Sequence, residues 1–208
     1  MPDIAREAKF MGSVTALSMH EMQNILAIIR ESAGLMGDIL RVNAKVDFKH
    51  RPNMERTLEH ITTHVMRGKA LLEATSRLAH SPDDDLVEGC DLAVYARVVA
   101  LLSERLARLK GAAVEFTPAT SSMLISVGAL NVLMVGYQAV QWAVGGGTKN
   151  GVIRLEAKKG QDSHALTIVP PADVTLDAEG LTLLESLLES GSLIWDGKCL
   201  QLLFPAQK

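Results

Sequence analysis

Three polar side chains with different chemistry lie close together in the first part of the chain. His20, Glu21 and Asn24 fall within the run SMHEMQNILAIIR, residues 18–30. An exposed imidazole with the reference pKa of about 6.5 is largely neutral near pH 7 and can act as a nucleophile. On a helix, the carboxylate next to it could orient the other ring proton and stabilise developing positive charge, and the amide lies one turn further on the same side. A histidine beside a glutamate is also commonly a plain solvated pair, so the surrounding elements must decide.

The segment around these residues has the pattern of one long helix. A period near 3.5 that continues over five heptads is typical of a helix packed in a coiled coil or bundle. With Ser18 at position d and Met22 at position a, His20 falls at f and points away from the bundle. Further apolar residues widen the stripe and favour a four-helix bundle. The stripe consists of Ile4, Ala8, Met11, Thr15, Ser18, Met22, Ile25, Ile29, Ser32, Met36 and Ile39, widened by Val14, Leu17, Leu26, Ile28 and Leu35.

A second helix is predicted after a polar connector at residues 44–53, with Asn53 as its expected cap. It should end near Ala79. Two long helices joined by a short loop form an antiparallel hairpin, and pairing two copies would cover its open apolar side. We therefore expect a homodimer. The apolar positions of this helix step by three and four, at Met54, Leu58, Ile61, Val65, Leu72, Thr75 and Ala79.

The run Ser81-Pro82-Asp83-Asp84-Asp85 predicts a break between two domains, residues 1–82 and 83–208. Beyond it, strands are expected at 87–92, 112–117, 122–126, 151–158, 164–169, 192–196 and 199–204. Helices are expected at 93–110, 128–144 and 177–190. The predicted fold class is α+β, in which a helical hairpin that dimerises into a four-helix bundle precedes an α/β sandwich.

Composition excludes several classes of protein. The chain has 208 residues, 48% of them apolar, and a net charge of -3. This charge is too negative for a strongly basic nucleic-acid binder, so no nucleic-acid partner is expected. No apolar run reaches 18 residues, and the polar start does not fit a secretory leader, so we expect a cytoplasmic protein without a membrane partner. Cys90 and Cys199 lie far apart without a metal-binding motif and are expected to be small buried hydrophobes.

Residues 18–30 resemble the phosphoacceptor box of two-component histidine kinases, a helical HExxNxL segment. His20, Glu21, Asn24 and Leu26 match its positions. The resemblance implies that His20 accepts a phosphoryl group. It also implies that Asn24 could position water when a partner's phospho-aspartate is hydrolysed. The place of this segment in the first helix of a hairpin favours this interpretation over a solvated pair.

The second domain resembles a degenerate GHKL-type ATP-binding fold, such as follows this hairpin in histidine kinases. Residues 132–140 resemble the helix of the N box, and residues 179–195 and 200–205 resemble the last helix and strands. The expected asparagines fall on Met134 and Gln138. Pro170-Pro171 replaces a glycine-rich element, and proline lacks the N–H that a nucleotide contact would use. Only Gly180 remains of the second glycine box, so ATP binding is not expected.

This combination resembles the dimeric histidine phosphotransferases of phosphorelays. The resemblance implies reversible transfer between a receiver-domain aspartate of a response regulator and His20, with Glu21 and Asn24 assisting. No cofactor and no resident metal are expected, and magnesium would come from the receiver. A non-catalytic pseudokinase that acts as a scaffold and an aspartyl-phosphate phosphatase remain alternatives, and nucleotide binding would indicate a true kinase.

One further pair of residues has metal-ligand spacing. His60 and His64 are separated by four residues on the second predicted helix, so they could share a metal ion. Two solvated histidines are the more common outcome of such a spacing, because no carboxylate or cysteine nearby completes a ligand set.

Overall fold

The computed structural model describes residues 4–46, 49–84, 89–145, 151–172, 174 and 177–207. The chain divides into two compact units, residues 1–79 and residues 80–208. Each unit has its own core and is described by itself. No helix in the described ranges combines the length and apolar character that a membrane crossing requires.

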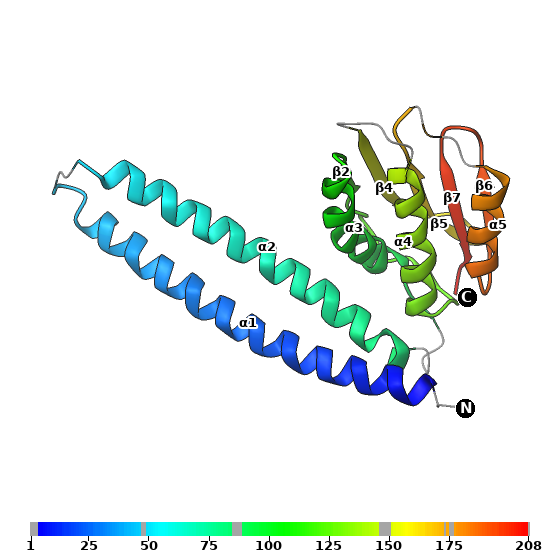
Figure 1. The fold of residues 1–208 in the computed structure, drawn as a ribbon, viewed down its shortest axis with the longest axis horizontal. Helices are drawn as coiled ribbons and strands as arrows, with labels where there is room; N and C mark the ends of the chain where they lie inside the picture. Colours follow the sequence, from blue (N-terminus) through cyan, green and yellow to red (C-terminus); the bar gives the residue numbers. More distant parts are fainter. Residues whose placement is uncertain are drawn as a thin grey trace. The chain divides into compact units, whose positions relative to one another are not determined.

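Unit 1 is a hairpin of two long helices, α1 (Ile4–Val42) and α2 (Arg51–Asp84), which run side by side (Figure 1); the last turn of α2, from residue 80, is counted with unit 2. The predicted apolar positions of α2 face α1: Leu58, Val65 and Leu72 are buried. Near the turn, Ala33 and Leu40 of α1 pack with Leu58 in one apolar cluster. The antiparallel hairpin predicted from the two heptad patterns is therefore present.

The hairpin turn is closed by the side chain of Arg51. Its guanidinium donates hydrogen bonds to the backbone carbonyls of Leu40 (2.7 Å), Asn43 (2.6 Å) and Val46 (2.9 Å). These carbonyls lie at and beyond the C-terminus of α1, where a helix leaves acceptors unpaired and a cation is favoured. The expected cap at Asn53 was wrong, because α2 already begins at Arg51. Pro52 is accommodated in the first turn, where its missing N–H has no helical partner to lose.

The end of α2 also differs from the prediction. The helix continues through Ser81 and Pro82 to Asp84 instead of ending near Ala79. Proline removes only its own N–H and leaves the N–H groups before it in place, so a helix can reach a proline in its last turn before ending. Asp85 to Glu88 lie outside the described residues, so the predicted strand over 87–92 is described only from residue 89 onward.

Unit 2 alternates helices and strands close to the predicted ranges. A five-stranded sheet has the order β2-β4-β5-β7-β6, with β2 parallel to β4 and the other neighbours antiparallel. A two-stranded antiparallel sheet pairs β1 with β3. The elements are β1 (Cys90–Asp91), α3 (Leu92–Leu109), β2 (Ala113–Thr117), β3 (Leu124–Ile125), α4 (Ala129–Gly145), β4 (Val152–Lys158), β5 (Ser163–Val169), α5 (Ala178–Leu187), β6 (Ser192–Trp195) and β7 (Leu200–Pro205).

The core of unit 2 lies between the helices and one face of the larger sheet. Buried residues alternate along β4 and β7, and side chains such as Leu155, Leu166 and Leu202 are fully buried on the face toward the helices. The central strand β5 is buried over five consecutive residues, 164–168. On the other face, Arg154 pairs with Glu115 across β2 and β4 at 3.4 Å. The helices and the mixed sheet together give the α+β class predicted from the sequence.

The entry to α3 is held by Asp91. Its carboxylate accepts hydrogen bonds from the backbone N–H of Ala93 (2.9 Å), the N–H of Met123 (3.0 Å) and the hydroxyl of Ser122 (2.7 Å). The first bond caps the helix, and the other two join the start of α3 to the segment before β3. Partial burial would raise the pKa of Asp91, but the hydrogen bonds to the ionised form outweigh it and lower the pKa below its ordinary value.

Candidate functional site

The three predicted site residues all lie on the exposed surface of α1. His20, Glu21 and Asn24 are exposed, and within the described residues none of them makes a hydrogen bond or ion pair. His20 and Asn24 are one turn apart on the same side of the helix, whereas Glu21 lies about 100° around the helix from His20. The structure thus places an imidazole and an amide together on an open surface, with the carboxylate beside them on another face.

Over residues 19–42, the apolar side of α1 is broad, and only part of it is covered by α2. Ala33 and Leu40 are buried against α2. The a and d positions of the heptad pattern lie next to them on the helix, and there Met22, Ile25, Ile29, Met36 and Ile39 are 41–52% exposed. We call these five residues the α1 stripe. The polar side of α1, which bears His20 and Asn24, lies on the opposite side of the helix.

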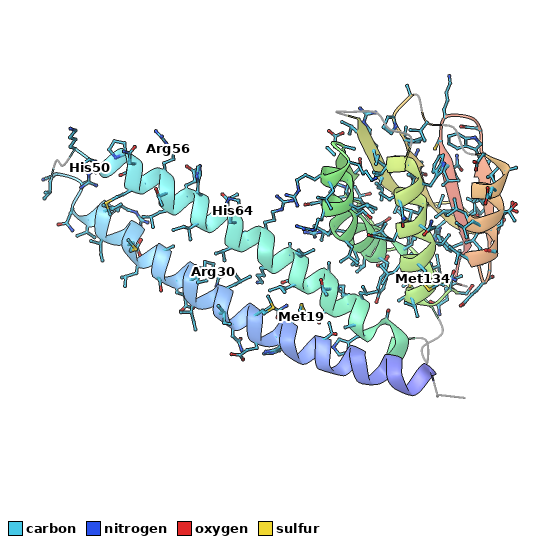
Figure 2. The ribbon with its side chains drawn as sticks, in the orientation of Figure 1. Met19, Arg30, His50, Arg56, His64 and Met134 are labelled. Atoms are coloured by element: carbon cyan, nitrogen blue, oxygen red, sulfur yellow. The ribbon has the colours of Figure 1, made fainter. Side chains whose placement is uncertain are left out.

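A shallow recess of about 60 Å³ begins one turn after His20. Gln23 and Ala27 follow His20 by three and seven residues, so they lie on the same side of α1. Two cations, Arg30 and Lys69, line the recess from α1 and α2 (Arg30 is labelled in Figure 2). The complete lining is Gln23, Leu26, Ala27, Arg30, Val65, Met66 and Lys69. We call this the α1–α2 recess. Met66 is 50% exposed and adds an apolar surface to it.

The opposite edge of the hairpin has a second and wider recess of about 400 Å³. Its lining includes both histidines with metal-ligand spacing, His60 and His64 (His64 is labelled in Figure 2). We call it the histidine recess. It is lined by Leu26, Thr57, His60, Ile61, His64 and Val65. The sequence identified the histidine pair by its spacing but gave no sign that a recess lies beside it, because one wall comes from the other helix.

In unit 2, the helix that resembles the N box is α4. Met134 is 48% exposed, and Gln138 is half-buried. The polar residue that the sequence analysis missed is Asn131, which is 4% exposed and donates a hydrogen bond from Nδ2 to the carbonyl of Leu187 (2.7 Å). Asn131 therefore ties α4 to the end of α5. The sequence gives only a weak signal for this role, because α4 contains two further amides, Gln138 and Gln141.

In the two segments that correspond to glycine boxes, some backbone N–H groups are missing and another is already bonded within the chain. Pro170 and Pro171 directly follow β5, and neither has an N–H to donate. The N–H of Gly180 donates to the carboxylate of Asp177 (2.8 Å), which is the N-cap of α5. The backbone donor at Gly180 is thus used to begin a helix.

No protein-family model and no curated protein matches the chain. Solved structures to which the chain shows a weak similarity include three histidine kinases. The blue-light activated histidine kinase EL346 of Erythrobacter litoralis is 14% identical, with a TM-score of 0.47 over 73% of this chain and 60% of that one. The Acinetobacter baumannii histidine kinase AdeS is 12% identical, with a TM-score of 0.46 over 91% of this chain and 98% of that one.

The histidine kinase ThkA, solved in complex with the response regulator protein TrrA, is 17% identical to this chain, with a TM-score of 0.46. The match covers 98% of this chain and 64% of that one. At identities of 12–17% and TM-scores below 0.5 these similarities carry no conclusion about this chain, whose activity must be argued from its own residues.

Proposed function

We propose that the chain is a phosphorelay histidine phosphotransferase, which moves a phosphoryl group reversibly between a receiver aspartate and His20. The observation that carries this proposal is the open position of His20 on α1, with Asn24 on the same side one turn away. A nucleophile that reacts with another protein's aspartyl phosphate must protrude from its own surface. The matching motif residues, from His20 to Leu26, supply the second support.

The transfer is a simple exchange of bonds at phosphorus. A nitrogen lone pair of neutral His20 attacks the phosphoryl group, a P–N bond forms, and the P–O bond to the aspartate breaks and releases its carboxylate. The second ring nitrogen keeps its proton, so the phosphorylated ring carries positive charge. Glu21, the next residue in the sequence, would stabilise that charge. Magnesium bound to the receiver would neutralise charge on the phosphoryl oxygens.

The α1–α2 recess is the proposed contact surface for the receiver. It begins beside His20 and combines apolar surface from Ala27 and Met66 with the cations Arg30 and Lys69. A partner that places an aspartyl phosphate at His20 would cover this side of the hairpin. The apolar centre with a charged rim is a common composition for transient protein interfaces.

We also propose that two copies of the chain pair through the α1 stripe. Its five large apolar side chains are exposed beside the residues of α1 that already pack on α2. A stripe with heptad spacing fits the core of a four-helix bundle, so a second hairpin is the occupant that its pattern favours. Pairing on that face leaves His20 outside the bundle.

Autophosphorylation with ATP is not part of the proposal. The segment after β5 offers prolines where a nucleotide contact needs N–H donors, and the N–H of Gly180 is already bonded to Asp177. The test is equilibrium binding of a fluorescent ATP analogue with magnesium. Saturable binding to unit 2 would indicate a true kinase instead.

The transfer itself is tested with a receiver labelled with radioactive phosphate. Label should appear on the wild-type chain, be absent from His20→Ala, and be retained by His50→Gln, a matched substitution of another exposed histidine. Labelling of His20→Ala at the wild-type level would refute the assignment of His20.

A phosphatase is the second candidate, because Asn24 is exposed on the same side as His20. In that case the receiver would lose its label without any transient label on the chain, and Asn24→Ala would prevent the loss. Binding of the receiver with neither outcome would indicate a non-catalytic scaffold.

A further inference from the structure

The histidine recess lies on the opposite edge of the hairpin from the α1–α2 recess. On α2 it is lined by Thr57, His60 and His64, whereas the α1–α2 recess is lined by Met66 and Lys69. On a helical projection these two sets fall on opposite flanks of the buried position Val65. The two recesses share only Leu26 and Val65 in their linings, and the histidines lie on the flank of α2 away from the surface proposed for phosphotransfer.

The two imidazoles are available as ligands. His60 and His64 are both exposed, and among the described residues neither forms a hydrogen bond or an ion pair. Residues four apart on a helix project one above the other, which is the spacing that lets two histidines share one metal ion in helical zinc sites. Leu26, Ile61 and Val65 form an apolar floor between the helices, so they supply no competing donor or acceptor side chain.

We propose that His60 and His64 form a two-imidazole chelate for a divalent transition-metal ion of the Zn²⁺, Ni²⁺ or Cu²⁺ class. Imidazole nitrogen suits these ions, whereas Mg²⁺ and Ca²⁺ prefer oxygen ligands. The described residues contain no group of three or more His, Cys, Asp or Glu side chains that could hold a metal. The ion would therefore keep water in its other positions, which makes the site open and exchangeable.

The surroundings limit the affinity of this site. Arg56 precedes His60 by one turn and Arg67 follows His64 by three residues, so both cations oppose a bound metal ion, while Glu59 favours it. The recess of about 400 Å³ leaves room for the ion and its waters. The sequence spacing alone favoured two solvated histidines, and the shared recess with its apolar floor is the observation that changes this interpretation.

The test is calorimetric titration of the full chain with ZnCl₂, with MgCl₂ as the oxygen-preferring comparison ion. We expect one Zn²⁺ per chain at this site and no comparable heat from Mg²⁺. His60→Gln and His64→Gln should each weaken Zn²⁺ binding by at least about tenfold, because the second imidazole binds within the same molecule at high effective concentration. His50→Gln should leave it unchanged.

Two further measurements keep the result unambiguous. Far-ultraviolet circular dichroism should show unchanged helix content in both variants, since glutamine has at least the helix propensity of histidine. In NMR spectra, the ring signals of His60 and His64 should shift together with added Zn²⁺. Unchanged affinity in both glutamine variants, or Zn²⁺-dependent shifts that leave either ring unaffected, would overturn the proposal. Neither outcome bears on phosphotransfer by His20.

Discussion

The most quantitative prediction concerns Asp91, whose carboxylate makes two kinds of contact at the start of α3. One bond, from the N–H of Ala93, caps the helix. The other two, from Met123 and Ser122, cross to the segment before β3. Asp91→Ala removes all three and leaves the N–H of Met123 without this acceptor. Asp177 is the matched control, because its carboxylate caps α5 through one bond, from Gly180, and makes no hydrogen bond to another element within the described residues.

The expected losses in the free energy of unfolding follow from the number of hydrogen bonds that each substitution removes. Loss of an N-cap side chain costs about 1 kcal/mol, so Asp177→Ala should lower the free energy of unfolding by that amount. Asp91→Ala should lose a similar cap plus two further hydrogen bonds worth about 1 kcal/mol each at a partly exposed site, or about 3 kcal/mol in total. The difference between the two variants measures the cross-link to the segment before β3.

The assay is urea unfolding followed by tryptophan fluorescence. Both tryptophans of the chain, Trp142 and Trp195, lie in unit 2, where their rings meet edge to face with centroids 5.2 Å apart. Their fluorescence therefore reports on unit 2 and not on the hairpin. Wild type, Asp91→Ala and Asp177→Ala should unfold with similar slopes and decreasing midpoints in the order wild type, Asp177→Ala, Asp91→Ala.

The same variants give a pH prediction with a definite sign. Because the pKa of Asp91 is lower in the folded state, its stabilising contribution is fully present above the unfolded pKa of about 3.9. It is lost as the pH falls through the lower folded pKa. The stability gap between wild type and Asp91→Ala should therefore be constant from pH 7 to pH 5 and shrink below about pH 4. A gap no larger than that of Asp177→Ala at pH 7 would refute this account of Asp91.

Three further substitutions test the packing of each unit. Arg51→Ala should lower the stability of the hairpin by about 2 kcal/mol, measured by thermal unfolding followed at 222 nm. Arg51→Lys should not restore it, and full stability in that variant would contradict the hydrogen bonding of one guanidinium to three carbonyls. Gly136→Ala should destabilise unit 2 by about 1–2 kcal/mol, although alanine has the better helix propensity, because the new Cβ would lie 2.9 Å from Val99 Cγ2. If the same urea assay found the variant more stable than wild type, α3 and α4 would be free to move apart. Ile25→Glu on the α1 stripe should convert the proposed dimer to monomer in sedimentation equilibrium, whereas Ile25→Val should not; a dimer in both would place the interface elsewhere.

Much of the fold was predictable because each element has a strong local pattern. The predicted ranges 93–110 and 128–144 differ by one residue at each end from α3 (Leu92–Leu109) and α4 (Ala129–Gly145). The two ends of α2 were missed for local reasons. Pro52 and Pro82 were interpreted as boundaries, yet the first is tolerated in an opening turn and the second in a closing turn.

The candidate site, like the fold, was predicted only in part from the sequence. The exposure of His20 agrees with the outward heptad position predicted for it, and Asn24 is exposed one turn further on. The roles of Arg51 and Asn131 were not predictable, because each bonds to backbone carbonyls. A carbonyl has no residue-type signal in the sequence, so only coordinates reveal that it is within reach.

The order of residues along α1 was enough to set which side chains share a face, since a helix turns each residue by a constant angle. It follows that His20 and Asn24 lie together, and that Ile25 and Ile29 lie together on another side. Which part of the broad apolar side of α1 packs within the chain was decided only when α2 folded back on it. That choice buried Leu40, left the α1 stripe exposed, and formed one recess beside His20 and another beside His60 and His64.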